Sequence, residues 1–196
     1  MSMAHDVFRY SLRRFIGTAG EYRVHERWAT IPNAITVAGI IGVVFYTWLF
    51  LTNSIVWAIP LVHIGVLLSD MLDGIAADAL DQHSRAGKFL EPLRDRMHAA
   101  ALFGNLILAA PESGVVAALV IAVAAETWIG FLAFRGFVHN VHAVGKIRAT
   151  VYGICGLAAL VQLYWVKSWF VPLSAFAITM AAASLGTAIC YSAKRP

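Results

Sequence analysis

The chain has 196 residues, of which 60% are hydrophobic and only 13% are charged, well below the roughly 25% charged residues of soluble domains. Its mean hydropathy is +0.72, and its formal net charge is +4 at pH 7. This composition excludes a soluble globular protein and predicts an integral membrane protein. No soluble basic domain is left to bind nucleic acid, so we expect anionic lipid head groups and phosphorylated substrates to face the basic surface.

The first predicted element is an amphipathic helix that precedes the membrane spans. Between Phe8 and Ile16, apolar residues recur at i, i+4, i+7 and i+8, and arginines lie off that stripe. We expect this helix to lie in the cytoplasmic interface of the membrane rather than to cross it. It belongs to a juxtamembrane segment, residues 1–30, ahead of a single domain at residues 31–196.

Six apolar runs follow, and each is close to the roughly 20 residues that a helix needs to cross a bilayer. They are residues 31–52, 54–79, 88–110, 114–136, 148–166 and 169–191. With the N-terminus in the cytoplasm, 14 of the 15 Lys and Arg residues fall on the cytoplasmic side, and only Lys167 lies outside. The sequence therefore predicts an all-α integral membrane protein with six transmembrane helices and both termini in the cytoplasm.

Six of the eleven carboxylates lie between residues 70 and 95, at the junction of the second and third spans. At about 100° per residue, Asp70 and Asp73 share one helical face, and Glu91 and Asp95 share a face of the next helix. Two helices joined by a short connection can therefore bring these four side chains together at one site. Oxygen ligands select hard cations, so we expect two divalent ions, Mg²⁺ or Mn²⁺, which could clamp a diphosphate.

Other ionisable residues are interpreted as structural. Asp78 and Asp81 are expected to be solvated groups at the membrane interface. Glu126 and His63, which lie deeper in predicted spans, are expected to be satisfied helix-packing groups rather than ligands.

The acidic stretch carries a family resemblance. The pattern Asp70-x-x-Asp73-Gly74-x-x-Ala77, followed by Gly87-x-x-x-Glu91-x-x-x-Asp95, resembles the signature of the CDP-alcohol phosphotransferases, DxxDGxxAR and then GxxxDxxxD. Within that family, GKFLEPLRDR at residues 87–96 is most similar to the phosphatidylglycerophosphate synthases, in which this segment usually reads GKFLDPLADK. The opening TIPNAIT, FRGF at residues 134–137 and GKIRATVYG at residues 145–153 are also similar to that subgroup.

The resemblance implies a set of site residues. Metal binding is expected of Asp70, Asp73, Glu91 and Asp95, and Asp95 is also the expected general base. The residues expected to bind the CDP moiety are Asp70, Gly74, Ala77, Ser84 and Gly87. Cations beside the fourth and fifth spans are expected to hold an acceptor phosphate by charge-assisted bonds, namely Arg135, Lys146 and Arg148.

The implied reaction moves a phosphatidyl group from CDP-diacylglycerol to an alcohol acceptor, glycerol 3-phosphate, and releases CMP. The implied setting is a homodimer in the bacterial inner membrane, among membrane lipids, with the active site facing the cytoplasm. Inositol phosphate or phosphatidylglycerol could instead be the acceptor. A non-catalytic lipid-binding relative and an ion or proton carrier are the alternatives from other classes.

Two positions depart from the family pattern. Asp78 stands where the family has arginine, which removes a cation and adds a negative charge near an anionic ligand. Glu91 stands where the family has the third aspartate, and its side chain is one methylene longer. Arg85 and Lys88 are the candidates to replace the missing cation.

Overall fold

The computed structural model describes residues 28–134, 142–166 and 171–193. This part of the chain forms six α-helices, and a short 3-10 helix, η1 (Val56–Ala58), precedes the second of them. The α-helices are α2 (Ile31–Leu51), α3 (Ile59–Ala79), α4 (Arg85–Ala109), α5 (Ser113–Phe134), α6 (His142–Tyr164) and α7 (Leu173–Ala193). The predicted all-α architecture is confirmed, whereas the predicted N-terminal amphipathic helix lies outside the described residues.

Five of these helices are long and apolar enough to cross a membrane, namely α2, α3 together with η1, α5, α6 and α7. Helix α4 is also long, at 25 residues. However, its first half carries a series of charged side chains between Arg85 and Arg96, which keeps it outside the group of candidate spans. Among the described residues, five of the six predicted spans are thus supported.

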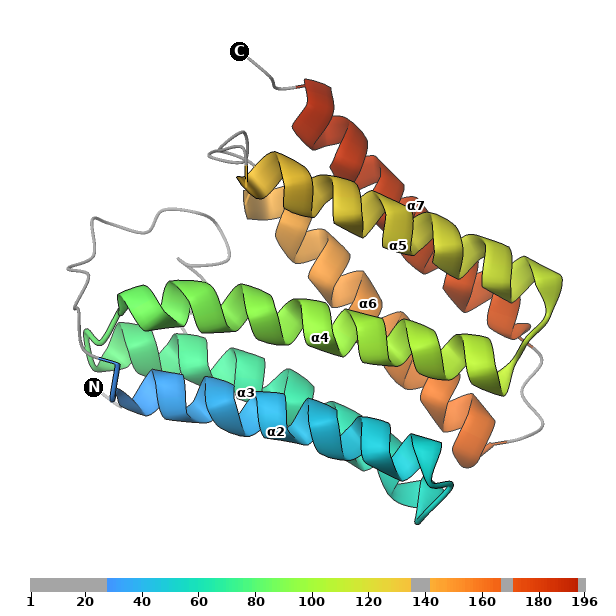
Figure 1. Ribbon diagram of the computed structural model, residues 1–196, viewed down its shortest axis with the longest axis horizontal. Helices are drawn as coiled ribbons and strands as arrows, with labels where there is room; N and C mark the ends of the chain where they lie inside the picture. The colour runs from blue at the N-terminus through green and yellow to red at the C-terminus, as the bar shows by residue number, and fades with distance from the viewer. Residues whose placement is uncertain (1–27, 135–141, 167–170, 194–196) are drawn as a thin grey trace, which may run out of the picture. The chain divides into compact units, whose positions relative to one another are not determined.

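The chain divides into two compact units, Met1–Ala101 and Leu102–Pro196, and the division falls inside α4. In the first unit, α2 and α3 pack along each other (Figure 1). Small residues allow the close approach: a Cβ on Gly42 of α2 would lie 3.0 Å from Cγ2 of Val66 on α3. Such small residues are typical of packed membrane helices, where van der Waals contact replaces the hydrophobic effect as the attraction between helices.

A short turn connects α3 to α4. The backbone of Asp81 has a φ of 49°, in the left-handed region, directly after the C-cap residue Leu80. This conformation ends helices and is tolerated by aspartate better than by most residues. The chain therefore reverses within residues 80–84 and brings the start of α4 back to the end of α3.

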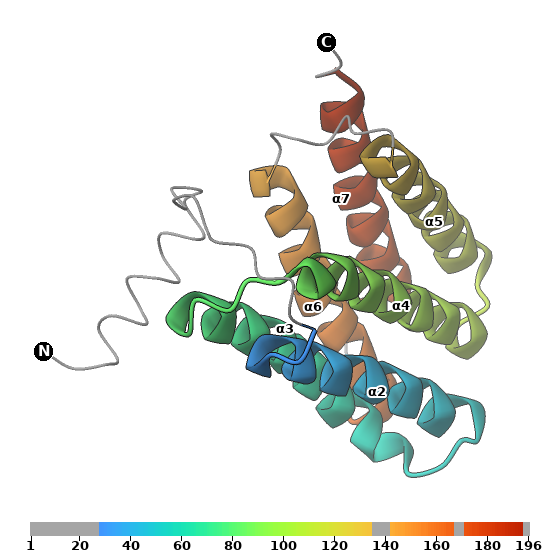
Figure 2. The same ribbon diagram turned by 60° about the vertical axis from the view of Figure 1, so that its left-hand side comes forward.

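In the second unit, α7 packs against both α5 and α6, and Figure 2 shows α5 beside α7. A buried cluster joins the two, with Ala125, Ile129 and Leu132 from α5 and Ala188 and Tyr191 from α7. These residues are spaced three or four apart on each helix, so they form one apolar face per helix.

Candidate active site

Three of the four predicted metal-binding carboxylates meet at one arginine, Arg94. Its guanidinium donates from Nη1 to Asp73 Oδ2 and from Nη2 to Asp70 Oδ1. Nη2 also donates to Asp95 Oδ1, at 3.0 Å. Asp70 and Asp73 come from α3, whereas Arg94 and Asp95 come from α4, so the predicted convergence of these two helices is found.

The members of this group differ sharply in burial. The side chains of Arg94 and Asp73 are 1% and 2% exposed, whereas those of Asp70 and Asp95 are 56% and 60% exposed. Asp73 also accepts a 2.7 Å hydrogen bond from the hydroxyl of Thr36 on α2. The group therefore has a buried inner part, Arg94 with Asp73, and an outer part whose carboxylates face solvent or a ligand.

The three carboxylates can together bind a cation, and in this structure the cation that they bind is the Arg94 guanidinium. Among the described residues, no three His, Cys, Asp or Glu side chains are arranged to hold a metal ion. The guanidinium engages one oxygen each of Asp70, Asp73 and Asp95, which leaves the second oxygen of each without a bond to it. These second oxygens and Glu91 on α4 offer the hard oxygen ligands that Mg²⁺ and Mn²⁺ prefer.

The residues expected to bind the CDP moiety lie buried in helix contacts, apart from Asp70. Gly74, Ala77, Ser84 and Gly87 are all buried. Ser84 Oγ accepts from the Gly87 amide at 2.9 Å and donates to Oδ1 of Asn33, also at 2.9 Å, which fixes the start of α4 on α2. A Cβ on Gly87 would lie 3.0 Å from the same Asn33 oxygen. In this structure, Ser84 and Gly87 allow the close contact between α4 and α2, and their role in binding CDP stays a prediction.

Asp78 was expected to be a solvated group at the membrane interface, and this expectation is wrong. Its side chain is only 5% exposed, and its Oδ1 lies 3.0 Å from Nε2 of His83. Asp81 is exposed, as expected. The candidate replacement cations, Arg85 and Lys88, are also exposed, and the cation that binds Asp70, Asp73 and Asp95 is Arg94.

Sequence reasoning missed Arg94, although a signal was present. Arg94 lies seven residues after Gly87, so it falls within about 20° of Gly87 on the helix. It therefore lies on the same helical face as Gly87 and about 60° from Glu91, which are two of the predicted site residues of α4. It also stands where the similar segment GKFLDPLADK has alanine.

His63 lies in a contact between helices, which agrees with the helix-packing role expected of it. Its ring is fully buried, and Nδ1 lies 2.9 Å from Nε2 of His98 on α4. Tyr46 of α2 packs against both rings. This cluster contributes to the contacts among α2, α3 and α4.

A second polar group lies in the other unit and includes a predicted acceptor-phosphate residue. Nη1 of Arg148 on α6 lies 3.1 Å from Oε2 of Glu126 on α5. The Tyr152 hydroxyl lies 2.6 Å from Glu126 Oε1 and also contacts Ser184 of α7. The expectation that Glu126 is a satisfied helix-packing group is confirmed. Lys146 lies on α6, and Arg135 lies outside the described residues.

Replacing Glu126 with Gln is expected to lower the free energy of unfolding by about 2 kcal/mol, because the Arg148 guanidinium loses its ion pair in a partly buried position. The introduced glutamine can still accept the Tyr152 hydrogen bond, so the loss isolates the charge. Denaturant unfolding of the purified protein in micelles measures the difference.

Thr127→Val is the matched control for this change. Thr127 is exposed, and within the described part of the chain its hydroxyl bonds only to the Val123 carbonyl of its own helix, at 2.8 Å. We expect its unfolding midpoint to equal that of the wild type. An unchanged midpoint for Glu126→Gln would show that the ion pair contributes nothing to stability.

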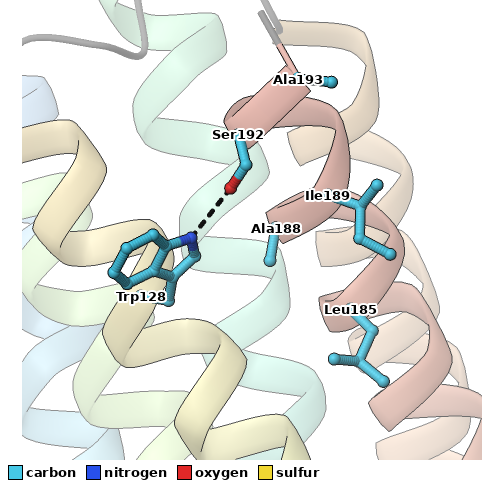
Figure 3. A pocket seen from close by; sticks show the side chains of 6 residues that line it. All are labelled: Trp128, Leu185, Ala188, Ile189, Ser192 and Ala193. Atoms are coloured by element: carbon cyan, nitrogen blue, oxygen red, sulfur yellow. Dashed lines mark hydrogen bonds between the residues drawn. The ribbon is translucent and has the colours of Figure 1, made fainter. Parts of the chain in front are cut away.

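An apolar groove lies between α5 and α7, with a volume of about 490 Å³ (Figure 3). Trp128 forms one side, and its indole N–H donates to Ser192 Oγ at 2.9 Å. The other lining residues are Leu185, Ala188, Ile189 and Ala193. None of the lining side chains is charged, so the groove suits a hydrocarbon chain and provides no group for chemistry.

Comparisons with known proteins agree with the motif. Residues 29–188 match the sequence model of a family described as CDP-alcohol phosphatidyltransferase. A phosphatidylinositol phosphate synthase of Cutibacterium acnes is 34% identical over 87 residues, which cover 43% of this chain and 42% of that protein. The CDP-diacylglycerol–glycerol-3-phosphate 3-phosphatidyltransferase of Escherichia coli K12 is 26% identical over 165 residues, 79% of this chain and 87% of that enzyme. No solved structure matches the chain. Because the family match spans most of the chain and includes the helices that carry Asp70, Asp73 and Asp95, this protein belongs to the CDP-alcohol phosphatidyltransferase family.

Proposed function

We propose that this protein transfers the phosphatidyl group of CDP-diacylglycerol to glycerol 3-phosphate and releases CMP. The observation that carries the proposal is the convergence of Asp70, Asp73 and Asp95 from two helices of a family member. The glycerol 3-phosphate acceptor is supported by the match to the Escherichia coli enzyme, which covers 87% of that enzyme's length.

In the proposed reaction, Asp95 is the general base. Asp95 would accept the proton of the acceptor hydroxyl as that oxygen attacks the phosphorus, and CMP would leave. Its Oδ2 makes no bond to Arg94 and its side chain is 60% exposed, so it can approach a bound hydroxyl. A carboxylate acts as general base only within hydrogen-bond reach of the proton that it takes.

Divalent cations are part of the proposal. Asp70, Asp73, Glu91 and Asp95 would hold Mg²⁺ or Mn²⁺, which would neutralise the diphosphate and stabilise the leaving oxygen. Ser84, Gly74, Ala77 and Gly87 would shape the CDP pocket. Arg135, Lys146 and Arg148 would hold the acceptor phosphate; for Arg148 this means that phosphate competes with Glu126.

The proposed setting is the bacterial inner membrane, with the site on the cytoplasmic side and the protein as a homodimer. The distribution of Lys and Arg supports the orientation, since basic residues accumulate in cytoplasmic loops. The proposal of a bacterial membrane is supported by the bacterial origin of the relatives. The dimer rests on the family resemblance.

The test is CMP release by the purified protein in lipid, with CDP-diacylglycerol and Mg²⁺ or Mn²⁺. Parallel reactions supply glycerol 3-phosphate, inositol phosphate, phosphatidylglycerol or no acceptor, and mass spectrometry identifies the lipid product. We expect release and phosphatidylglycerophosphate only with glycerol 3-phosphate. CMP release with inositol phosphate instead would show that this protein makes phosphatidylinositol phosphate, the product in the name of the Cutibacterium relative. No release with any acceptor would favour a non-catalytic lipid-binding protein.

A further inference from the structure

Arg94 occupies a site that three helices build around it. Its guanidinium bonds to Asp70 and Asp73 of α3 and to Asp95 of its own helix, α4. Its aliphatic part passes beside Gly39 of α2, where an added Cβ would lie 2.9 Å from Arg94 Cδ and would also collide with Ser69. The side chain is 1% exposed. A buried charge is tolerated only when it is paired, so the three carboxylates around Arg94 are what allows an arginine to be buried at this position.

The charge balance of the site limits the number of metal ions that can join this arginine. Four carboxylates, those of Asp70, Asp73, Glu91 and Asp95, would balance two divalent ions. Arg94 adds a fixed positive charge in direct contact with three of them. Without bound CDP-diacylglycerol, two ions and the guanidinium would carry one positive charge more than the four carboxylates can neutralise, whereas one ion leaves a single negative charge.

We propose that the Arg94 guanidinium takes the place of one of the two divalent cations, so that this site binds a single metal ion. The inference rests on the metal dependence of the proposed function and changes its stoichiometry. The buried inner part, Arg94 with Asp73, is the permanent cation site. The remaining ion binds at the outer part, where the carboxylates of Asp70 and Asp95 are exposed.

The test counts Mn²⁺ ions bound per chain. Purified full-length protein in nanodiscs of phosphatidylcholine, which is zwitterionic, is titrated with Mn²⁺, and electron paramagnetic resonance measures the free ion. Arg94→Ala restores the residue of the similar segment GKFLDPLADK, and Arg94→Gln removes the charge while keeping a polar side chain. The matched control is Arg96→Ala, since Arg96 is exposed and forms no ion pair with Asp70, Asp73 or Asp95.

We expect one Mn²⁺ in the wild type and in Arg96→Ala, and two in the Arg94 variants. Two ions or none in the wild type would overturn the inference even if both Arg94 variants failed to fold, and so would a single ion in folded Arg94→Ala. CMP release by the wild type is measured on the same samples. A wild type that binds two ions and releases CMP overturns this inference alone, whereas one bound ion without release with any acceptor overturns the proposed function alone.

Discussion

Replacing Asp95 with Asn is expected to lower CMP release by about 10²- to 10⁴-fold, the range that general-base catalysis typically contributes. The introduced asparagine cannot accept a proton at neutral pH. Its side-chain carbonyl can still accept the hydrogen bonds that Arg94 donates to Asp95 Oδ1, so the contact between this position and the buried arginine is preserved. Initial rates with saturating CDP-diacylglycerol and glycerol 3-phosphate measure the loss.

The matched control is Asp81→Asn. Asp81 undergoes the same chemical change, but it is exposed in the turn between α3 and α4, and its left-handed backbone also suits asparagine. We expect its rate and its unfolding midpoint to equal those of the wild type. Turnover retained by Asp95→Asn, with Asp81→Asn normal, would remove Asp95 from the role of general base.

Much of the helical architecture could be predicted because membrane spans have a strong, local signal in hydropathy. The predicted run at residues 31–52 corresponds to α2 at Ile31–Leu51, and the run at 88–110 corresponds to α4 at Arg85–Ala109. Hydropathy was less informative about whether α4 crosses the membrane. The first half of α4 is charged, so the helix does not have the composition of a membrane span.

The convergence of Asp70, Asp73 and Asp95 could be predicted from helical periodicity and a short connection, since both are properties of the backbone. The partner of these carboxylates could not be predicted in the same way. Periodicity says which side chains share a face, but whether a cation on that face is buried depends on the neighbouring helix. Here Gly39 of α2 leaves the space that Arg94 fills. The burial of Asp78 also escaped prediction, because periodicity does not show that His83, in the turn after α3, lies 3.0 Å from its carboxylate.

Replacing Asp73 with Ala is expected to lower the free energy of unfolding by about 3–5 kcal/mol, because the change leaves the Arg94 charge buried without its buried partner. The same change at Asp70 removes an equal charge and another bond to Arg94, yet we expect a loss of no more than about 1 kcal/mol. The difference follows from burial: the Asp73 side chain is 2% exposed and that of Asp70 is 56% exposed. Unfolding of both variants in mixed micelles measures the two losses.

A double variant separates the loss of the Asp73 contacts from the cost of the orphaned charge. If the buried guanidinium causes most of the loss, Arg94→Met combined with Asp73→Ala should be more stable than the sum of the two single changes predicts, because neither charge then remains in the interior. Strict additivity would mean that Asp73 stabilises the protein through other contacts, such as its 2.7 Å hydrogen bond from Thr36. Equal losses for Asp70→Ala and Asp73→Ala would show that burial does not set the strength of these ion pairs.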